Sequence, residues 1–176
     1  MTTGANMKAK QQDPAPYILE RQAIQATGED QIIKDALAIL ERRAKIPGAV
    51  FHTPDAVKQF FVMRNAAEAD QYAERFTVLF LDSQNALMAA ETMFTGTLAQ
   101  TSVYPREIVR AALKHNAAAV VFSHNHPSGP VQPSRADEAL TQNLKSALAL
   151  VDCRVLDHII VGQGGQSLSM AEKGLM

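Results

Sequence analysis

The sequence contains little cysteine, no excess of charge of one sign and no long apolar run. Cys153 is the only cysteine among 176 residues, which excludes an internal disulfide and any zinc site built from several thiolates. The formal net charge is −1, so the chain lacks the positive excess that is typical of duplex-binding domains. No apolar run approaches the roughly 20 residues that span a bilayer, and the N-terminus has no signal-like stretch. We therefore expect a cytoplasmic protein with no membrane partner.

The pattern of apolar residues predicts one α/β domain that follows a helical extension. Residues 1–16 are polar and include glycine and proline, as is typical of a flexible tail. Residues 17–50 contain an amphipathic helix, which a capping box at Thr27 to Asp30 would begin. From residue 51 onward, short apolar runs alternate with helical periods. This alternation favours an α/β or α+β domain with a mixed sheet over residues 51–176.

Local signals predict the order of the elements within that domain. A proline at the first helical position favours two of the helices, and continuous apolar runs favour the buried strands. The predicted elements are a helix from Thr53, strands over 76–81 and 87–94 joined as a hairpin, a helix from Pro105, a strand over 117–122, a helix from about Ser134 to Leu150, and strands over 155–161 and 167–170.

The stretch SHNHPSGPVQPSRAD, residues 123–137, directly follows one of the predicted strands. At the end of an extended strand, His124 and His126 point to the same side because they are two residues apart. The prolines and glycine that follow turn the chain, and the next helix start can return Asp137 toward the histidines. Two imidazoles and one carboxylate leave a fourth position for water, which is the pattern of catalytic rather than structural zinc sites.

The same stretch also has a purely structural interpretation. Ser134 and Asp137 have the spacing of a helix N-cap with an acidic residue in the first turn, and two loop histidines can simply be solvated. The Ser134–Asp137 spacing alone, or the histidine pair alone, favours that interpretation. The two together at the end of a buried strand favour a metal site. The two interpretations are compatible, because a capped helix end would hold Asp137 in place.

The arrangement His-x-His, seven residues, Ser, two residues, Asp is the metal-binding signature of the JAB/MPN (JAMM) metalloprotease fold. The stretches FTGTLAQTSVYPREIVRAALKHNAAAVVFSHNHPSGPVQPSRADE and VLDHIIVG closely resemble the bacterial RadC-like branch of that fold, and the resemblance covers about residues 52–176. It implies a mixed β-sheet flanked by helices, with a cytidine-deaminase-like architecture. Longer family members carry an N-terminal helix-hairpin-helix domain. The first 50 residues show no such paired-helix turn, so we expect a short form of the family.

The resemblance also implies a mechanism. One Zn²⁺ per chain would be held by His124, His126 and Asp137, and would lower the pKa of its bound water to about 7. The family pattern needs a glutamate on an early strand as general base, and the matching position is Glu91, with a solvent-facing edge carboxylate as the alternative. Ser134 would help to stabilise the oxyanion. The implied reaction is hydrolysis of a peptide or isopeptide bond by Glu-assisted attack of that water.

Other polar residues allow weaker predictions. Asp157 and His158 could orient a zinc ligand, although a hydrogen-bonded pair in the core is the more common arrangement. His115 lies near the end of a predicted helix, where an imidazole is ordinary, and Cys153 is expected to be a small buried residue. His52 lies in a connector and receives no role.

The expected partner is a peptide or a protein conjugate that serves as substrate. Arg106, Arg110 and Lys114 share a helical face at four-residue spacing, which is typical of a solvated face, although a protein partner or nucleic acid could use it. The RadC-like family has a historical DNA-repair label. The alternative function is therefore a DNA-associated or protein-interaction module whose metal is structural, and a homo-oligomer also stays open.

Overall fold

The computed structural model describes residues 28, 30–36, 38–39, 51, 53–68, 70, 72–96 and 103–176. The described residues between 28 and 39 are helical, in agreement with the helix predicted there, whereas the predicted tail and Thr27 lie outside the described residues. Contacts divide the chain into two units, residues 1–32 and 33–176. The sheet and helices described next all belong to the second unit.

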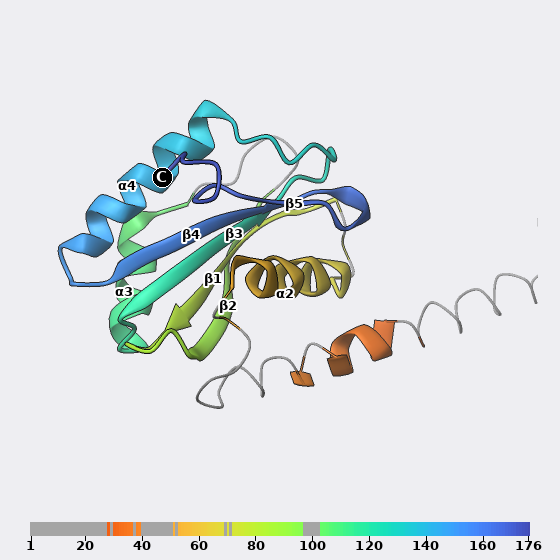
Figure 1. The fold of residues 1–176 in the computed structure, drawn as a ribbon, viewed down its shortest axis with the longest axis horizontal. Helices are drawn as coiled ribbons and strands as arrows, with labels where there is room; N and C mark the ends of the chain where they lie inside the picture. Colours follow the sequence, from red (N-terminus) through yellow and green to blue (C-terminus); the bar gives the residue numbers. More distant parts are fainter. Residues whose placement is uncertain are drawn as a thin grey trace, which may run out of the picture. The chain divides into compact units, whose positions relative to one another are not determined.

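A five-stranded mixed sheet forms the centre of this unit (Figure 1). The strands are β1 (Glu74–Leu81), β2 (Leu87–Gly96), β3 (Ala119–Asn125), β4 (Arg154–Val161) and β5 (Ser167–Ser169). Their order across the sheet is β2-β1-β3-β4-β5. β3 and β4 run parallel, and the other neighbouring pairs are antiparallel. The predicted fold class, a mixed sheet flanked by helices, is confirmed.

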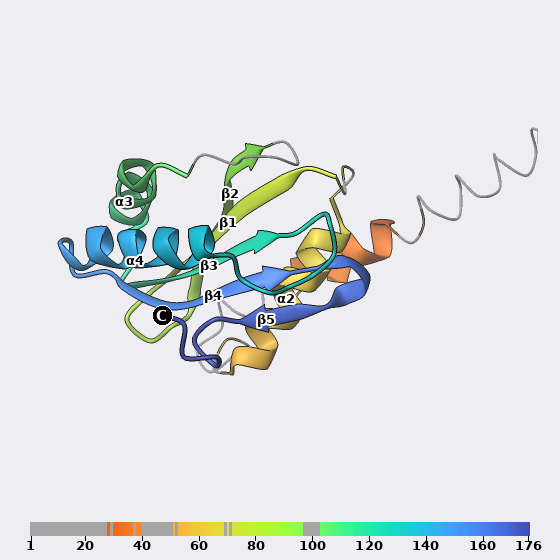
Figure 2. The same cartoon turned by 90° about the horizontal axis from the view of Figure 1, so that it is seen from above.

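Helices cover both faces of the sheet. They are α2 (Pro54–Ala66), α3 (Pro105–Lys114) and α4 (Arg135–Ala149), with a short 3₁₀ helix η1 (Gln163–Gly165) between β4 and β5. The helices α3 and α4 pack on one face and α2 packs on the other (Figure 2). The Thr53 hydroxyl caps α2 by accepting from the backbone N of Ala56 at 3.3 Å. Among the helices described, none is long and apolar enough to cross a membrane.

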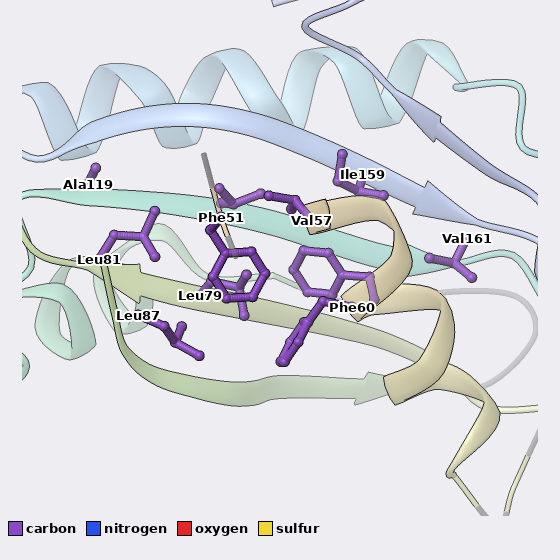
Figure 3. Packing of buried hydrophobic residues seen from close by; sticks show 11 residues of the cluster. Phe51, Val57, Phe60, Leu79, Leu81, Leu87, Ala119, Ile159 and Val161 are labelled. Carbon is purple, nitrogen blue, oxygen red and sulfur yellow. The ribbon is translucent and has the colours of Figure 1, made fainter. Parts of the chain in front are cut away.

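Each face of the sheet has its own apolar core, because successive strand residues point to opposite sides. Figure 3 shows the core beneath α2, where the rings of Phe51 and Phe60 meet edge-on with centroids 5.1 Å apart. On the other face, Phe76 and Phe122 pack with α3 and α4. Cys153 belongs to this second core, and its burial raises the pKa of the thiol, in agreement with its predicted role as a small buried residue.

Several strand ends differ from the prediction: β2 continues to Gly96 in place of residue 94, and β3 begins at Ala119 in place of residue 117. β1 begins at Glu74, two residues before its run, and β3 continues through residues 123–125. The latter three residues are polar, yet they remain in the strand because β4 pairs with all three and β1 pairs with Ser123 and His124. His124 lies opposite Phe76 on one side and Ile160 on the other. The central strand therefore ends in three buried polar residues.

Leu148 and Leu150 allow a matched test of the core beneath α4. Leu148 is fully buried, whereas Leu150 is 86% exposed. We expect Leu148→Ala to lower the free energy of unfolding by about 2–5 kcal/mol, because it removes buried methyl groups and leaves a cavity. Leu150→Ala should change it by less than about 0.5 kcal/mol. Denaturant unfolding followed by circular dichroism measures both values, and equal losses would contradict this packing.

Candidate metal centre

The side chains of His124, His126 and Asp137 meet where β3 ends. One ligand atom from each residue lies within 4.8 Å of the others. The His124 Nε2 atom is 2.9 Å from His126 Nε2 and 3.3 Å from Asp137 Oδ1, and His126 Nε2 is 3.8 Å from Asp137 Oδ2. The structure therefore brings together the three side chains that the sequence predicts as metal ligands.

The sheet determines where the imidazole of His124 points. Along β3, Val120 and Phe122 face α3 and α4, and His124 continues this alternation. Asn125 holds the end of the strand. Its Oδ1 accepts from the backbone N of Arg75 at 2.7 Å, and its Nδ2 donates to the carbonyl oxygen of Ala73 at 2.9 Å. These bonds leave the residue before Asn125 little freedom to move.

The loop after His126 is held against the end of β4. The backbone N of His126 donates to the carbonyl of Val161 at 2.8 Å. A Cβ atom at Gly162 would lie 2.2 Å from the carbonyl oxygen of Gly129, so no larger residue permits this close approach. Gly129 itself has a φ of 110°, a conformation that residues with a side chain rarely adopt. Two glycines thus allow the turn that follows the histidines.

This turn also sets the tautomer of His126. The carbonyl oxygen of Pro130 lies 2.7 Å from His126 Nδ1. Because a carbonyl can only accept a hydrogen bond, Nδ1 carries a proton, and Nε2 is the ring nitrogen that faces His124 and Asp137. Hydrogen bonding of this kind to the far ring nitrogen is typical of metal-binding histidines.

Asp137 has two roles at the start of α4. Its Oδ2 atom accepts from both the backbone N and the Oγ of Ser134 at 2.7 Å, and its own backbone N donates to Ser134 Oγ at 3.2 Å. These bonds form a capping box. The Oδ1 atom faces His124. The capping and ligand interpretations of the sequence are both compatible with this geometry, because Oδ1 is outside the capping box and faces His124.

Burial keeps the imidazole of His124 neutral. The residue is 4% exposed, and its burial lowers the pKa to about 4; Asp137 opposes this shift and His126 adds to it. His158 packs behind it, and burial, with help from the two other histidines, lowers its pKa well below the usual value. Neutral imidazoles retain the lone pair that a metal ion needs.

The chemistry and spacing of the three donors fit Zn²⁺. Bonds of about 2.0–2.2 Å from zinc to nitrogen and oxygen place tetrahedral donors roughly 3.4 Å apart. The two imidazole nitrogens are 2.9 Å apart and His124 Nε2 is 3.3 Å from Asp137 Oδ1, both close to that value, while the 3.8 Å contact of His126 is with the other carboxylate oxygen, Oδ2. Within the part of the chain that the structure describes, the group includes no fourth His, Cys, Asp or Glu ligand. Three protein ligands with one open position match the catalytic type of zinc site.

Glu91, the residue that the sequence predicts as general base, lies apart from this cluster. Its Oε1 atom is 2.7 Å from His115 Nε2. Glu91 pairs with Val78, and Val78 pairs with Phe122, which precedes His124 by two residues. With strands about 4.8 Å apart and a rise of about 3.3 Å per residue, the Cα atoms of Glu91 and His124 are roughly 12 Å apart. The structure does not bring Glu91 to the three ligands.

Glu74, at the first position of β1, lies on the same face of the sheet as His124. Phe76 pairs directly with His124, and residues two apart in a strand share a face. Continuing this antiparallel register by two residues sets Glu74 beside His126. Its side chain is half-buried. The sequence contains a signal for this residue, namely a carboxylate two positions before the first apolar residue of the strand Phe76–Leu81.

The imidazole of His158 and the carboxylate of Asp157 have different partners, although the backbone N of His158 donates to Asp157 Oδ1 at 2.7 Å. The Nε2 atom of His158 lies 2.8 Å from His124 Nδ1. The Asp157 carboxylate instead accepts from Ser169 Oγ at 2.6 Å and from the backbone N of Ala171 at 3.1 Å. His158 therefore contacts a candidate metal ligand, as one of the two predictions from the sequence has it. Asp157 has a structural role at the C-terminal turn.

The basic residues of α3 form a solvated face. Arg106, Arg110 and Lys114 are 85%, 79% and 70% exposed, and acidic neighbours pair with them. Arg110 Nη2, for example, lies 2.5 Å from Glu107 Oε2. His52 lies outside the described residues.

Comparison with known proteins bears on the whole region that contains the sheet and the cluster. The family described as RadC-like JAB domain matches residues 51–175. The chain belongs to this family. It is 67% identical over 128 residues to a UPF0758 protein of Verminephrobacter eiseniae, an alignment that covers 73% of this chain and 52% of that protein.

Two other relatives show how the covered length varies. A UPF0758 protein of Variovorax paradoxus is 53% identical over 159 residues, which cover 87% of this chain and 69% of that protein. UPF0758 protein YeeS of Escherichia coli is 50% identical over 149 residues, which cover 85% of this chain and 98% of that protein. The chain thus spans about half the length of several RadC-like relatives and nearly all of YeeS.

The metal-free RadC-like domain should lose stability as the pH falls. His124 has a folded-state pKa of about 4 against an ordinary 6.5, and the pKa of His158 shifts in the same direction. The unfolded chain therefore binds protons at these histidines more readily than the folded chain does. The contribution of the two neutral histidines to the free energy of unfolding is complete above about pH 6.5 and is lost progressively toward about pH 4. Thermal melts in the presence of a chelator measure this. A melting temperature that stays constant between these pH values would contradict the buried, neutral histidines.

Proposed function

We propose that this chain is a zinc-dependent hydrolase of the JAMM type that cleaves a peptide or isopeptide bond. The observation that carries the proposal is the convergence of two imidazole nitrogens and one carboxylate oxygen from His124, His126 and Asp137. Zn²⁺ held by these atoms would supply a Lewis acid that lowers the pKa of water and polarises the scissile carbonyl. Membership of the RadC-like JAB family supports the same reaction class.

We assign the general base to Glu74 in place of Glu91. What supports Glu74 is its position on the face of β1 that carries Phe76, the direct partner of His124. A carboxylate there can take a proton from the attacking water and return it to the leaving amine. The carboxylate of Glu91 contacts His115, and β1 lies between its strand and β3, which carries His124.

Ser134 is the proposed oxyanion donor. Its exposed hydroxyl lies at the N-terminus of α4, where backbone N–H groups favour negative charge. In the structure this hydroxyl donates to Asp137 Oδ2. It would therefore have to turn toward the substrate as charge develops on the carbonyl oxygen. Loss of one such donor typically lowers the rate about 10²–10³-fold.

A cavity next to His126 offers space for a substrate. Its volume is about 380 Å³, within the range that small-molecule and peptide sites occupy. It lies between α2, the turn after the histidines and η1. The residues that line it include Asn65, Tyr72, Asn125, Pro127 and Gln163. We propose that one side of the cleaved amide binds here, since His126 both lines the cavity and is one of the three candidate metal ligands.

Elemental analysis tests the metal site. We expect one zinc ion per chain in the purified protein, because three neutral or anionic donors are already placed at suitable distances. His126→Ala should lose the metal, since two donors remain. His115→Ala is the matched control, as this histidine contacts Glu91 and lies outside the cluster, and it should retain zinc. Wild-type protein that takes up no divalent ion would end the hydrolase proposal.

A pair of glutamine variants tests the general base. Glu74→Gln should retain zinc and lose about 10²–10⁴-fold of the turnover, because proton transfer would have no acceptor. Glu91→Gln should retain both zinc and turnover. An unbiased screen for amide cleavage supplies the substrate, and single-turnover rates give the comparison. The reverse result would return the role to Glu91.

The same preparations distinguish the alternative function. Its supporting observation would be DNA binding by metal-depleted protein together with no cleavage by zinc-loaded protein. The net charge of −1 and the acid-paired basic residues of α3 do not favour that outcome.

A further inference from the structure

A chain of hydrogen bonds connects two of the candidate ligand residues through the interior of the domain. His124 Nδ1 lies 2.8 Å from His158 Nε2, and His158 Nδ1 lies 2.6 Å from Thr141 Oγ1. Thr141 Oγ1 donates in turn to the main-chain carbonyl oxygen of Asp137 at 2.7 Å. His158 and Thr141 are both completely buried. This series of hydrogen bonds therefore starts at the imidazole of His124 and ends at the backbone of Asp137.

The last bond determines the direction of all three. A carbonyl oxygen can only accept, so the single hydroxyl proton of Thr141 goes to Asp137, and Thr141 must accept from His158. The other nearby acceptor, Met170 Sδ, is 3.8 Å away and is weaker. A neutral His158 that donates from Nδ1 has a bare Nε2, and this nitrogen accepts the proton of His124 Nδ1. His124 is then unprotonated at Nε2, the atom that faces the other ligands.

The opposite direction would be incompatible with a metal. If Thr141 donated to His158 Nδ1, His158 would carry its proton on Nε2 and would donate to His124 Nδ1. His124 would then be protonated at Nε2, where the ligand lone pair is needed. One hydroxyl group, remote from the ligand atoms, thus separates a metal-binding tautomer from one that cannot bind.

We propose that His158 and Thr141 are positioning residues that select the Nδ1-protonated tautomer of His124 and so keep its Nε2 atom available to a metal ion. The inference rests on the proposed metal site, but it concerns two residues outside the ligand set.

The surroundings of His158 strengthen this role. The rings of Phe76 and Phe122 meet its imidazole edge-on, with centroids 5.5 and 5.8 Å away. These apolar walls hold the plane of the ring and exclude water that could replace a lost hydrogen bond. Thr141 lies one helical turn after Asp137 on α4, so its hydroxyl also links the first turn of α4 to β4. The orientation of His124 and the backbone of Asp137 therefore depend on the same group.

Long-range ¹H–¹⁵N correlation spectra of the metal-free wild-type protein test the tautomer directly. We expect His124 and His158 each to carry the proton on Nδ1, with His115 as a histidine outside the circuit for comparison. A spectrum in which His158 carries its proton on Nε2 and His124 Nδ1 carries none would overturn the proposal. This measurement needs no substitution in the core, so it remains decisive if a variant fails to fold.

Thr141→Val and Thr141→Ser form a matched pair for the metal itself. Valine has nearly the shape of threonine but no hydroxyl, so Thr141→Val should weaken Zn²⁺ binding by up to about 10–100-fold, the effect of losing the hydrogen-bond partner of a ligand histidine, because it frees His158 to take the other tautomer. Thr141→Ser retains the hydroxyl and should restore the affinity. Competition against a chromophoric chelator measures both, with melting temperatures of the metal-free variants as the check on folding.

The outcomes separate this proposal from the one on which it rests. Wild-type affinity in a folded Thr141→Val variant would overturn the positioning role and leave the metal site intact. Wild-type protein that binds no Zn²⁺ would instead end the hydrolase proposal, and the tautomer of His124 in the metal-free protein would still decide the present one.

Discussion

β3 is hydrogen-bonded to β1 on one side and to β4 on the other, and all seven of its residues are buried. A strand in that position cannot slip by one residue without turning every side chain to the wrong face of the sheet. His124 belongs to this strand, so its imidazole has the same fixed position as the apolar residues before it. The other parts of the candidate site are attached to this point by the turn after β3, by the capped start of α4 and by β4.

Such a location makes hydrogen bonding obligatory for the polar groups. An imidazole among phenylalanine rings is stable only when its nitrogens have partners, because a buried unpaired polar group costs on the order of 1–3 kcal/mol. Both ring nitrogens of His158 have partners, in His124 and Thr141. The Nδ1 atom of His124 has a partner as well, in His158. Its Nε2 atom is therefore the ring nitrogen that faces His126 and Asp137. In this way the requirement to satisfy buried groups and the requirement to present a ligand lone pair are met by the same bonds.

The residues that match the RadC-like JAB family, 51–175, contain every strand of the sheet and all three candidate ligands. The carboxylate ligand differs from the histidines in how it is held. Asp137 lies in the first turn of a helix, and the capping box with Ser134 fixes one of its oxygens while the other faces His124. A strand end and a helix start, joined by a turn that needs glycine at 129 and 162, are enough to bring the three donors together.

The sequence by itself determined most of the elements and pointed to the three candidate ligands, because these depend on signals a few residues apart. Pro54 and Pro105 mark helix starts, apolar runs mark β1 and β3, and both the His-x-His pair and the Ser134 cap are local patterns. Only the tertiary structure decided which glutamate shares a face with His124 and which side chain supports it. Glu74, Glu91 and His158 lie on three other strands, and their distances from His124 follow from strand order and register. Those are set by many weak contacts between distant segments, which no short stretch of sequence contains.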